Sequence, residues 1–301
     1  MTAGTARANH TIAVLPDMQL APLFAAYRAA AAARRFRLLT GAVIAAAVLA
    51  LSFVGAEVEP RTFWAKIGNA GDYFFRLAHL DTGAPVWTDP AEWFWGLKRW
   101  TRLLGETLLI AYVGTAVGVL GAFAACFVAS ERLVGNRWGR AAARRVLEVC
   151  RTVPDLVFAL IFVVAFGLGP LPGVMALAIH TAGALGKLFA EIVDNIDMKP
   201  VEGVAAAGGS WFARVRFGVV PQVLASFASY SLLRFEINVR GASVLGFVGA
   251  GGIGEELIIA IRRFYYADVS AILLLIVFCV MLIDMGSAQL RHSLARLEGA
   301  R

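Results

Sequence analysis

The stretch LLGETLLIAYVGTAVGVLGAFAACFVA, from Leu103 to Ala129, contains a single charged residue, Glu106. A helix needs about 20 predominantly apolar residues to cross the hydrocarbon core of a bilayer, which is ~30 Å thick. This run exceeds that requirement. It predicts a transmembrane helix, and this decides the class of fold in which the rest of the chain must be placed.

Five further apolar runs accompany the first. Counted together, the predicted spans are residues 38–56, 103–129, 153–168, 174–193, 219–248 and 271–290. The third begins with Pro154 and Asp155, so an earlier start near Arg145 is the alternative for that helix. A composition of 59% hydrophobic and 16% charged residues is far from that of a soluble domain. We predict an all-α, polytopic membrane protein with about six transmembrane helices.

Arginines gather in three of the segments that flank the apolar runs. They are Arg28, Arg34, Arg35 and Arg37 before the first run, Arg132, Arg137, Arg140, Arg144 and Arg145 after the second, and Arg291, Arg296 and Arg301 after the last. Cytoplasmic loops carry an excess of Lys and Arg. We therefore expect both termini in the cytoplasm, and orientation accounts for the formal net charge of +7 better than nucleic-acid binding does.

The chain is predicted to form one transmembrane domain, residues 38–290, between two cytoplasmic tails. The first tail, residues 1–37, is either an amphipathic helix on the membrane surface or a solvated helical tail, and the second is residues 291–301. On the outer side, the stretch WTDPAEWFWGLKRW (Trp87 to Trp100) suits a helix lying at the membrane interface, where Trp side chains concentrate.

Residues able to bind metals or form disulfides are scattered. The cysteines are Cys126, Cys150 and Cys279, without CxxC spacing, and the histidines are His10, His79, His180 and His292. No metal site, disulfide or catalytic constellation is expected.

Three glycine motifs resemble cofactor or nucleophile sites without meeting their requirements. GAGGIG, residues 249–254, matches the dinucleotide fingerprint but lies between apolar helices rather than in a βαβ unit. TAGALGKL, residues 181–188, lacks the first Gly and the final Ser or Thr of a phosphate-binding loop. GASVLG, residues 241–246, misses the GxSxG pattern. We expect no cofactor in this subunit and no ATP site of its own.

Between the fourth and fifth runs stands EGVAAAGGSWFARVRFGVVP, from Glu202 to Pro221, on the predicted cytoplasmic side. A short helix, a Gly turn and a second short helix would form a rigid knob there, whereas the alternative is a surface loop without a partner. The spacing of Glu202, Gly208 and Pro221 resembles the EAA loop of permeases in binding-protein-dependent ABC importers. This chain departs from the pattern at Gly203 and Val204, and at Gly218, which we expect to weaken packing at the start of the fifth span.

Two longer stretches sharpen the resemblance. RTVPDLVFALIFVVAFGLGPLPGVMALAIHTAGALGKLFAE and NVRGASVLGFVGAGGIG look like the permease subunit of phosphonate importers, and the similarity extends over residues 103–290. It implies the type I ABC importer permease fold in a bacterial inner membrane and a subunit that is not an enzyme. Importers of phosphite, phosphate or another small oxyanion would look alike, and a membrane-embedded enzyme or a passive channel is the alternative of a different class.

The resemblance also implies partners. They are a second permease subunit, identical or closely related, two cytoplasmic ATPases that use ATP and Mg²⁺, and an extracytoplasmic phosphonate-binding protein. The contact with the ATPase is expected in a coupling loop near residues 194–218. Its residues are Glu202, Gly203, Ala206, Ala207, Gly208, Gly209 and Pro221.

Charged side chains inside the spans are candidates for an anion path, because a charge at the bilayer centre costs about 2.5–3.5 kcal/mol. The candidates are Arg234, Lys187, Arg240 and His180. The structural alternative is i,i+4 pairing of Lys187 with Glu191 and of Glu236 with Arg240. Arg234 has no such partner on its own helix and is the strongest candidate.

Glycines and other small residues are expected in two further places. An outer gate is predicted at Gly249, Gly251, Gly252 and Gly254, where tight backbone turns would lie at the mouth of the bundle. The segments GTAVGVLGAFAA and HTAGALG would let helices approach closely, either between two permeases or within one subunit.

Overall fold

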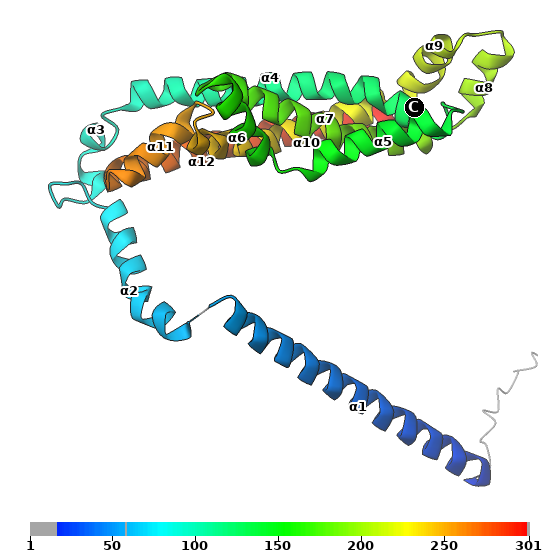
Figure 1. Ribbon diagram of the computed structural model, residues 1–301, viewed down its shortest axis with the longest axis horizontal. Coiled ribbons are helices and arrows are strands. Elements are labelled where there is room, and N and C mark those ends of the chain that lie inside the picture. Colours follow the sequence, from blue (N-terminus) through cyan, green and yellow to red (C-terminus); the bar gives the residue numbers. More distant parts are fainter. Residues whose placement is uncertain (1–16, 58, 300–301) are drawn as a thin grey trace, which may run out of the picture. The chain divides into compact units, whose positions relative to one another are not determined.

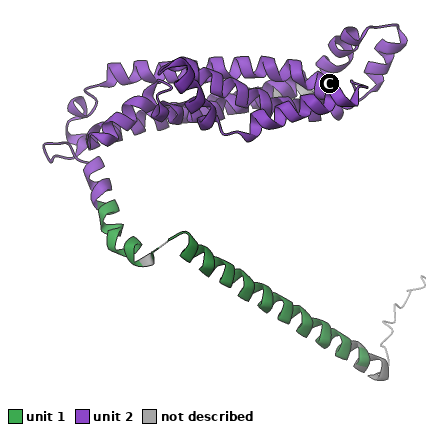
Figure 2. Ribbon diagram, in the orientation of Figure 1, with its two compact units in different colours: residues 1–71 green, residues 72–301 purple. Residues whose placement is uncertain are grey.

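The structure is a computed structural model that describes residues 17–57 and 59–299. It divides into two compact units, residues 1–71 and residues 72–301, which Figure 2 shows in different colours. Over the described ranges the regular elements are helices, and an isolated bridge between His79 and Pro85 is the β interaction among them. The predicted all-α class is confirmed.

Helix α1 (Asp17–Gly55) makes up most of the first unit, and helix α2 (Pro60–Leu77) begins in it. With 39 residues, α1 is about 58 Å long at ~1.5 Å per residue. It continues through residue 37 without a break, so the described part of the predicted tail is helical and joins the first predicted span. The predicted tail's residues 1–16 lie outside the described residues.

Four long helices form the centre of the second unit. They are α4 (Leu97–Ala129), α7 (Pro170–Asp194), α10 (Val220–Leu245) and α12 (Tyr266–Gly299). α4 contacts α7 and α10, and α10 contacts α12, so the helices lie side by side along the bundle (Figure 1). α4, α7 and α12 are each long and apolar enough to cross a membrane, as predicted for the second, fourth and sixth runs. The same holds for the stretch Phe24–Gly55 of α1, which contains most of the first predicted run.

The predicted third span is a bent pair of helices rather than one straight helix. α5 (Arg137–Thr152) and α6 (Asp155–Phe166) meet at 86°. α6 has 12 residues and is about 18 Å long, too short to cross a bilayer alone. The break lies at Pro154, which lacks an N–H group and disfavours helical geometry in the preceding residue, Val153. The third predicted run, 153–168, therefore corresponds to the shorter helix α6, and the alternative of a continuous helix from near Arg145 is wrong.

The fifth predicted span, residues 219–248, is also bent at its end. α10 continues into a 3-10 turn (Gly246–Val248) and then into α11 (Ile253–Arg262), with a bend of 49°. When each bent pair is counted as one span, the described residues hold up to six, in agreement with the predicted number.

Small residues allow α4 and α7 to approach closely. A Cβ atom placed at Gly118 would lie 2.6 Å from Thr181 Cβ, and one at Gly114 would lie 2.8 Å from Leu177 Cβ. In lipid such close contact is a main source of helix association, because apolar burial between helices gains little. These glycines therefore act within one subunit, which was one of the two expected roles.

The tryptophan-rich segment does not form one interfacial helix. Its helix α3 is only four residues long, Pro90–Trp93, and Trp100 belongs to the first turn of α4. Trp100 is 1% exposed and packs in a cluster with Ile253 and Leu257. The indole N–H of Trp93 donates to Ser270 Oγ at 3.0 Å. The segment therefore covers the ends of α11 and α12, because a buried indole needs both apolar contact and an acceptor.

Candidate functional site

The predicted coupling segment folds as two helical pieces around a glycine turn. α8 (Lys199–Ala206) precedes the turn, and α9 (Trp211–Ala213) leads through a π-helical turn, Arg214–Val219, into α10. At the end of α8, Gly209 N donates to Val204 O at 2.9 Å and Gly208 N to Ala205 O at 3.0 Å, the two bonds of a Schellman cap. Gly208 has a φ of +79°, which residues with a Cβ rarely adopt.

The segment stands at one end of the bundle, the end where α12 also finishes (Figure 1). Most of the residues predicted to face the ATPase are exposed there: Glu202, Gly203, Ala206, Ala207 and Gly208. Glu202 lies in the first turn of α8, where the helix dipole favours an acid.

Two predicted members of the segment have internal roles. A Cβ atom at Gly209 would lie 2.6 Å from Val204 Cγ1, so Gly209 serves the cap itself. Pro221 is exposed in the first turn of α10, directly after the π-helical turn.

Gly218 does not weaken the packing, contrary to our expectation. A Cβ atom there would lie 2.9 Å from Val201 Cα and 3.2 Å from Val201 N. Gly218 is buried, and Val201 is 4% exposed. The missing side chain lets the backbone of α8 lie directly on the π-helical turn, so a larger residue would force the two apart.

Sequence reasoning missed the aromatic part of this surface. Phe212 is 77% exposed and Phe217 is 63% exposed. Exposed apolar side chains beside a short helix are typical of a surface that a partner covers. The dipeptides Trp211-Phe212 and Arg216-Phe217 in the sequence were the signal that could have indicated this surface.

A buried polar layer joins three helices inside the bundle. Asn238 Nδ2 of α10 donates to Thr115 Oγ1 of α4 and to Thr181 Oγ1 of α7, both at 2.8 Å. All three residues are at most 5% exposed. Arg234, one turn earlier on the same face of α10, places Nε 3.4 Å from Thr181 Oγ1 and is half-buried. Among the described residues, no carboxylate forms an ion pair with Arg234.

The break between α5 and α6 lies beside this layer. His180 Nδ1 donates to Val153 O at 3.1 Å. Asp155 interacts electrostatically with both His180 and Arg234, beyond ion-pair distance. The structure thus brings together Arg234 and His180, which were predicted, and Asp155, whose signal was an acid within an apolar run.

Lys187 lies away from this layer. Its Nζ is 3.9 Å from Glu148 Oε1 of α5. Within the part of the chain that the structure describes, Glu191, the expected i,i+4 partner, forms no ion pair with Lys187, because α5 packs over this face of α7 and supplies a carboxylate. Lys187 is therefore already paired, with a residue on another helix.

Arg240 belongs to a charge network between α10 and α12. It donates to Glu236, as expected from the i,i+4 spacing, and also to Asp284 Oδ2 at 3.1 Å. Arg291 Nη1 of α12 binds the second oxygen of Glu236 at 2.9 Å. Arg240 and Arg234 therefore lie on different faces of α10, and sequence reasoning missed Asp284 and Arg291 as partners.

The predicted outer-gate glycines form a turn buried between α10 and α11. Gly249, Gly251 and Gly252 have φ values of +85°, +80° and +79°. Cβ atoms at Gly252 and Gly254 would lie 2.3 Å from Thr107 Oγ1 and 1.9 Å from Ser243 O. Only glycine allows this turn to pack on α4 and α10, and its role as a gate stays a prediction.

No cluster of three His, Cys, Asp or Glu residues suited to a metal ion occurs in the ranges that the structure describes.

Comparisons with known proteins agree with the architecture. Residues 117–294 match the family model described as binding-protein-dependent transport system inner membrane component. The phosphite transport system permease protein PtxC of Stutzerimonas stutzeri is 41% identical over 198 residues, which cover 66% of this chain and 72% of that protein. The putative cryptic phosphonate transport system permease protein PhnE2 of Escherichia coli (strain K12) is 49% identical over 117 residues, 39% of this chain and 96% of that one.

A solved structure of the MetNI methionine ABC transporter in inward-facing conformations shares the fold. Its TM-score is 0.56 at 18% identity, with 68% of this chain and 98% of that chain covered. Family match, relatives and fold agree, and the chain belongs to the binding-protein-dependent transport system inner membrane component family, the permease subunits of ABC importers.

Proposed function

We propose that this permease carries small phosphorus oxyanions into the cell, with organophosphonates as its main cargo. The similarity to permeases named for phosphite and phosphonate transport carries the proposal. Phosphite and phosphate are the alternatives within the same architecture. Membership of a permease family sets aside the membrane-embedded enzyme that the sequence left open.

The anion passes the polar layer around Arg234. This guanidinium is half-buried and free of a carboxylate partner among the described residues, and it stands beside the buried amide of Asn238. A planar guanidinium binds phosphorus oxyanions through paired, charge-assisted hydrogen bonds. His180 and Asp155 flank the same place. Lys187 and Arg240 already have carboxylate partners and are the weaker candidates.

The segment α8–α9 is the contact with the cytoplasmic ATPases, which hold ATP and Mg²⁺. Its exposed small residues and the exposed rings of Phe212 and Phe217 support this role, because they offer a shallow apolar surface at one end of the bundle. The end that carries α8 is then the cytoplasmic one. A phosphonate-binding protein delivers the cargo at the opposite end, near the buried glycine turn that we predict as the outer gate.

A second permease subunit covers the exposed face of α10. Leu233, Ile237, Arg240 and Val244 follow one another on this face at helical spacing, and the Arg240 side chain is 51% exposed. An arginine facing lipid near the bilayer centre is costly. A second copy of the permease that packs on this face removes that cost.

Uptake by the reconstituted importer tests the cargo and the path together. The permease, its ATPase and its binding protein are placed in proteoliposomes, and ATP-dependent uptake of a labelled phosphonate, phosphite and phosphate is compared. Loss of a hydrogen bond to a charged group corresponds to about 1.5–3 kcal/mol, so Arg234→Gln should lower phosphonate uptake by about 10- to 150-fold.

Arg234→Lys keeps the charge and should lose less, and Arg137→Gln, at an exposed arginine of α5, is the surface control. An assembled Arg234→Gln complex that imports phosphonate at the wild-type rate would remove Arg234 from the path. Faster uptake of phosphite or phosphate than of any phosphonate would make the cargo assignment wrong.

A further inference from the structure

The loop between α4 and α5, residues 130–136, is attached to the coupling segment. Trp211 Nε1 of α9 donates to Leu133 O at 3.3 Å. Leu133 and Trp211 also pack against the same hydrophobic cluster, which includes Val201 of α8. The coupling segment is therefore tied to this loop by a hydrogen bond and by shared apolar contacts.

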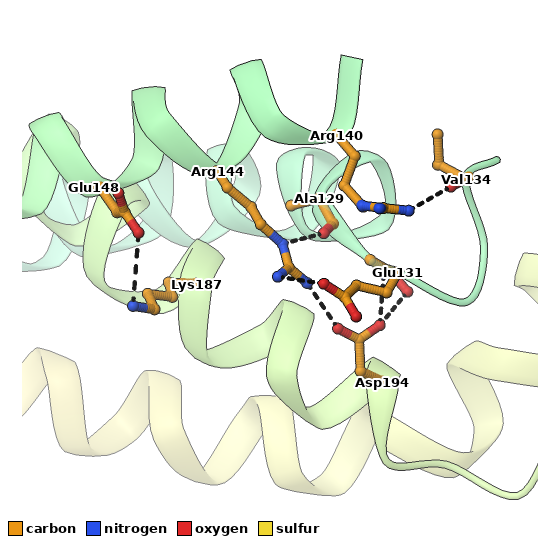
Figure 3. Close-up of polar contacts among 9 residues, drawn as sticks. Ala129, Glu131, Val134, Arg140, Arg144, Glu148, Lys187 and Asp194 are labelled. Carbon is orange, nitrogen blue, oxygen red and sulfur yellow. Dashed lines mark hydrogen bonds and ion pairs between the residues drawn. The ribbon is translucent and has the colours of Figure 1, made fainter. Parts of the chain in front are cut away.

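Asp194, the last residue of α7, holds the start of the same loop. Its Oδ1 accepts hydrogen bonds from Ser130 Oγ at 2.6 Å and from Glu131 N at 2.8 Å. Its Oδ2 binds Arg144 Nη2 of α5 at 2.9 Å. Figure 3 shows Arg144 at the centre of this group.

One guanidinium thus reaches three segments. Besides Asp194, Arg144 donates through Nε to Ala129 O at 2.8 Å and through Nη1 to Glu131 Oε1 at 2.9 Å. Ala129 ends α4 and Asp194 ends α7, so both acceptors lie at the negative ends of helix dipoles, where carbonyl groups lack helical partners. The fork of an arginine fits several acceptors at once, whereas the ammonium of a lysine is a single point of charge.

The neighbourhood of Arg144 is held by these bonds more than by packing. Farther along α5, the contact with α7 is tight: a Cβ atom at Gly183 would lie 2.7 Å from Arg151 N, and one at Gly186 would lie 2.6 Å from Leu147 Cδ2. Next to Arg144, a cavity of about 110 Å³ separates α5 from α7. On the Arg144 side of the Leu147 contact, the guanidinium joins α5 to α7 by its ion pair with Asp194, and the Lys187–Glu148 pair lies on the other side of the cavity.

The other end of α5 reaches the polar layer. Val153, which follows α5, accepts the hydrogen bond of His180, and Asp155 interacts with Arg234. Arg144 and Val153 are nine positions apart, about 14 Å along a helix axis. α5 is thus a continuous helix between the base of the coupling segment and the surroundings of Arg234.

We propose that Arg144 is a positioning residue that locks α5 to the coupling segment, so that α5 carries the segment's movement to the Arg234 layer. The inference rests on the proposed role of α8–α9 as the ATPase contact. When the ATPases move this segment, Asp194 and the 130–136 loop move with it. Arg144 then shifts α5, and with α5 the Val153 carbonyl and Asp155 that flank the anion path.

The ratio of phosphonate uptake to ATP hydrolysis, measured on the complete importer in proteoliposomes, tests this link. Arg144→Gln should retain hydrolysis and lower the ratio by about tenfold, within the ~5- to 150-fold that coupling between two sites typically spans. Arg145→Gln is the matched control, because the Arg145 side chain is 81% exposed and, among the described residues, forms its one ion pair with Glu148 of its own helix. Asp194→Asn removes the charge that Arg144 binds while keeping the side-chain shape, and should also lower the ratio.

A wild-type ratio in Arg144→Gln or Asp194→Asn would overturn the proposal. So would a proportional fall of uptake and hydrolysis in assembled complexes, because a purely structural role predicts that outcome. If neither variant assembles, the distance between spin labels at the exposed positions Arg145 and Glu202 tests whether α5 moves together with the coupling segment. A distance that stays constant through the ATP cycle supports a rigid link, and a changing distance refutes it.

Gly208→Asp separates this inference from the proposed function. If Gly208→Asp leaves uptake and stimulated hydrolysis intact, the assignment of α8–α9 as the ATPase contact is wrong. If Gly208→Asp abolishes coupling and Arg144→Gln does not, only the role of Arg144 is wrong.

Discussion

Two glycines of the coupling segment should respond in opposite ways to the same added methyl group. A Cβ atom at Gly203 or at Gly208 meets nothing within 4 Å, so only backbone conformation distinguishes them. Gly203 lies inside α8, where Gly→Ala gains about 0.5–1 kcal/mol. Gly208 has a φ of +79°, where a residue with a Cβ costs about 1–2 kcal/mol.

Hydrogen exchange of the α8 cap measures this difference directly. The amides of Ala207 and Gly209 bond to Gly203 O and Val204 O, so they exchange when the end of α8 opens. In the permease in lipid nanodiscs without ATPase, Gly208→Ala should speed exchange about 5- to 30-fold, from 1.4 kcal/mol per tenfold. Gly203→Ala should slow it about 2- to 5-fold by the same conversion.

Gly208→Asn should fall between Ala and the wild type, because Asn tolerates the left-handed region better than Ala. Equal exchange in the two alanine variants, or slower exchange in Gly208→Ala, would refute the argument that the φ of Gly208 limits the cap.

Two predictions concern close backbone contacts. Gly118→Val should destabilise the contact with Thr181 by about 1–3 kcal/mol through overpacking, and it should lower the Tm of the purified permease. Gly105→Val is the control, because a Cβ atom there meets nothing within 4 Å, and it should lower the Tm less. Equal Tm shifts in the two variants would contradict this prediction. Gly218→Ile should push Val201 off the π-helical turn and speed amide exchange throughout α8, whereas unchanged protection of α8 would show that the contact tolerates a side chain.

The sequence predicts a span where a single helix can satisfy its own backbone hydrogen bonds. Composition alone indicates α4, α7 and α12, because a long apolar helix pairs its backbone groups internally whatever surrounds it. The prediction for the third run missed the bend, because hydropathy measures how apolar a segment is and not whether its helix is continuous. Pro154 was visible in the sequence, but the 86° bend depends on α5 lying against α7, which residue composition does not show.

The two candidate sites differ in how far the sequence predicts them. The coupling segment depends on local chemistry, since Gly208 and Gly209 form hydrogen bonds with residues at most five positions away. The polar layer depends on distant pairs, such as Asn238 with Thr115. Intrahelical spacing suggested Glu191 as the partner of Lys187, yet α5 supplies Glu148. Pairing rules within one helix cannot take account of a helix that packs across it.

The break between α5 and α6, which the span prediction missed, supports the proposed position of the transport path. Within a membrane, irregular backbone is tolerated only where it is buried in protein or lines a water-filled cavity. At the α5–α6 break, the Val153 carbonyl is satisfied by His180, and the acid that follows, Asp155, interacts with Arg234. A straight third span would have kept this carbonyl in its own helix and left His180 without that acceptor. The bend therefore places irregular backbone beside Arg234, which forms no ion pair with a carboxylate among the described residues. It lies between the helix that Arg144 holds and the anion that Arg234 would bind.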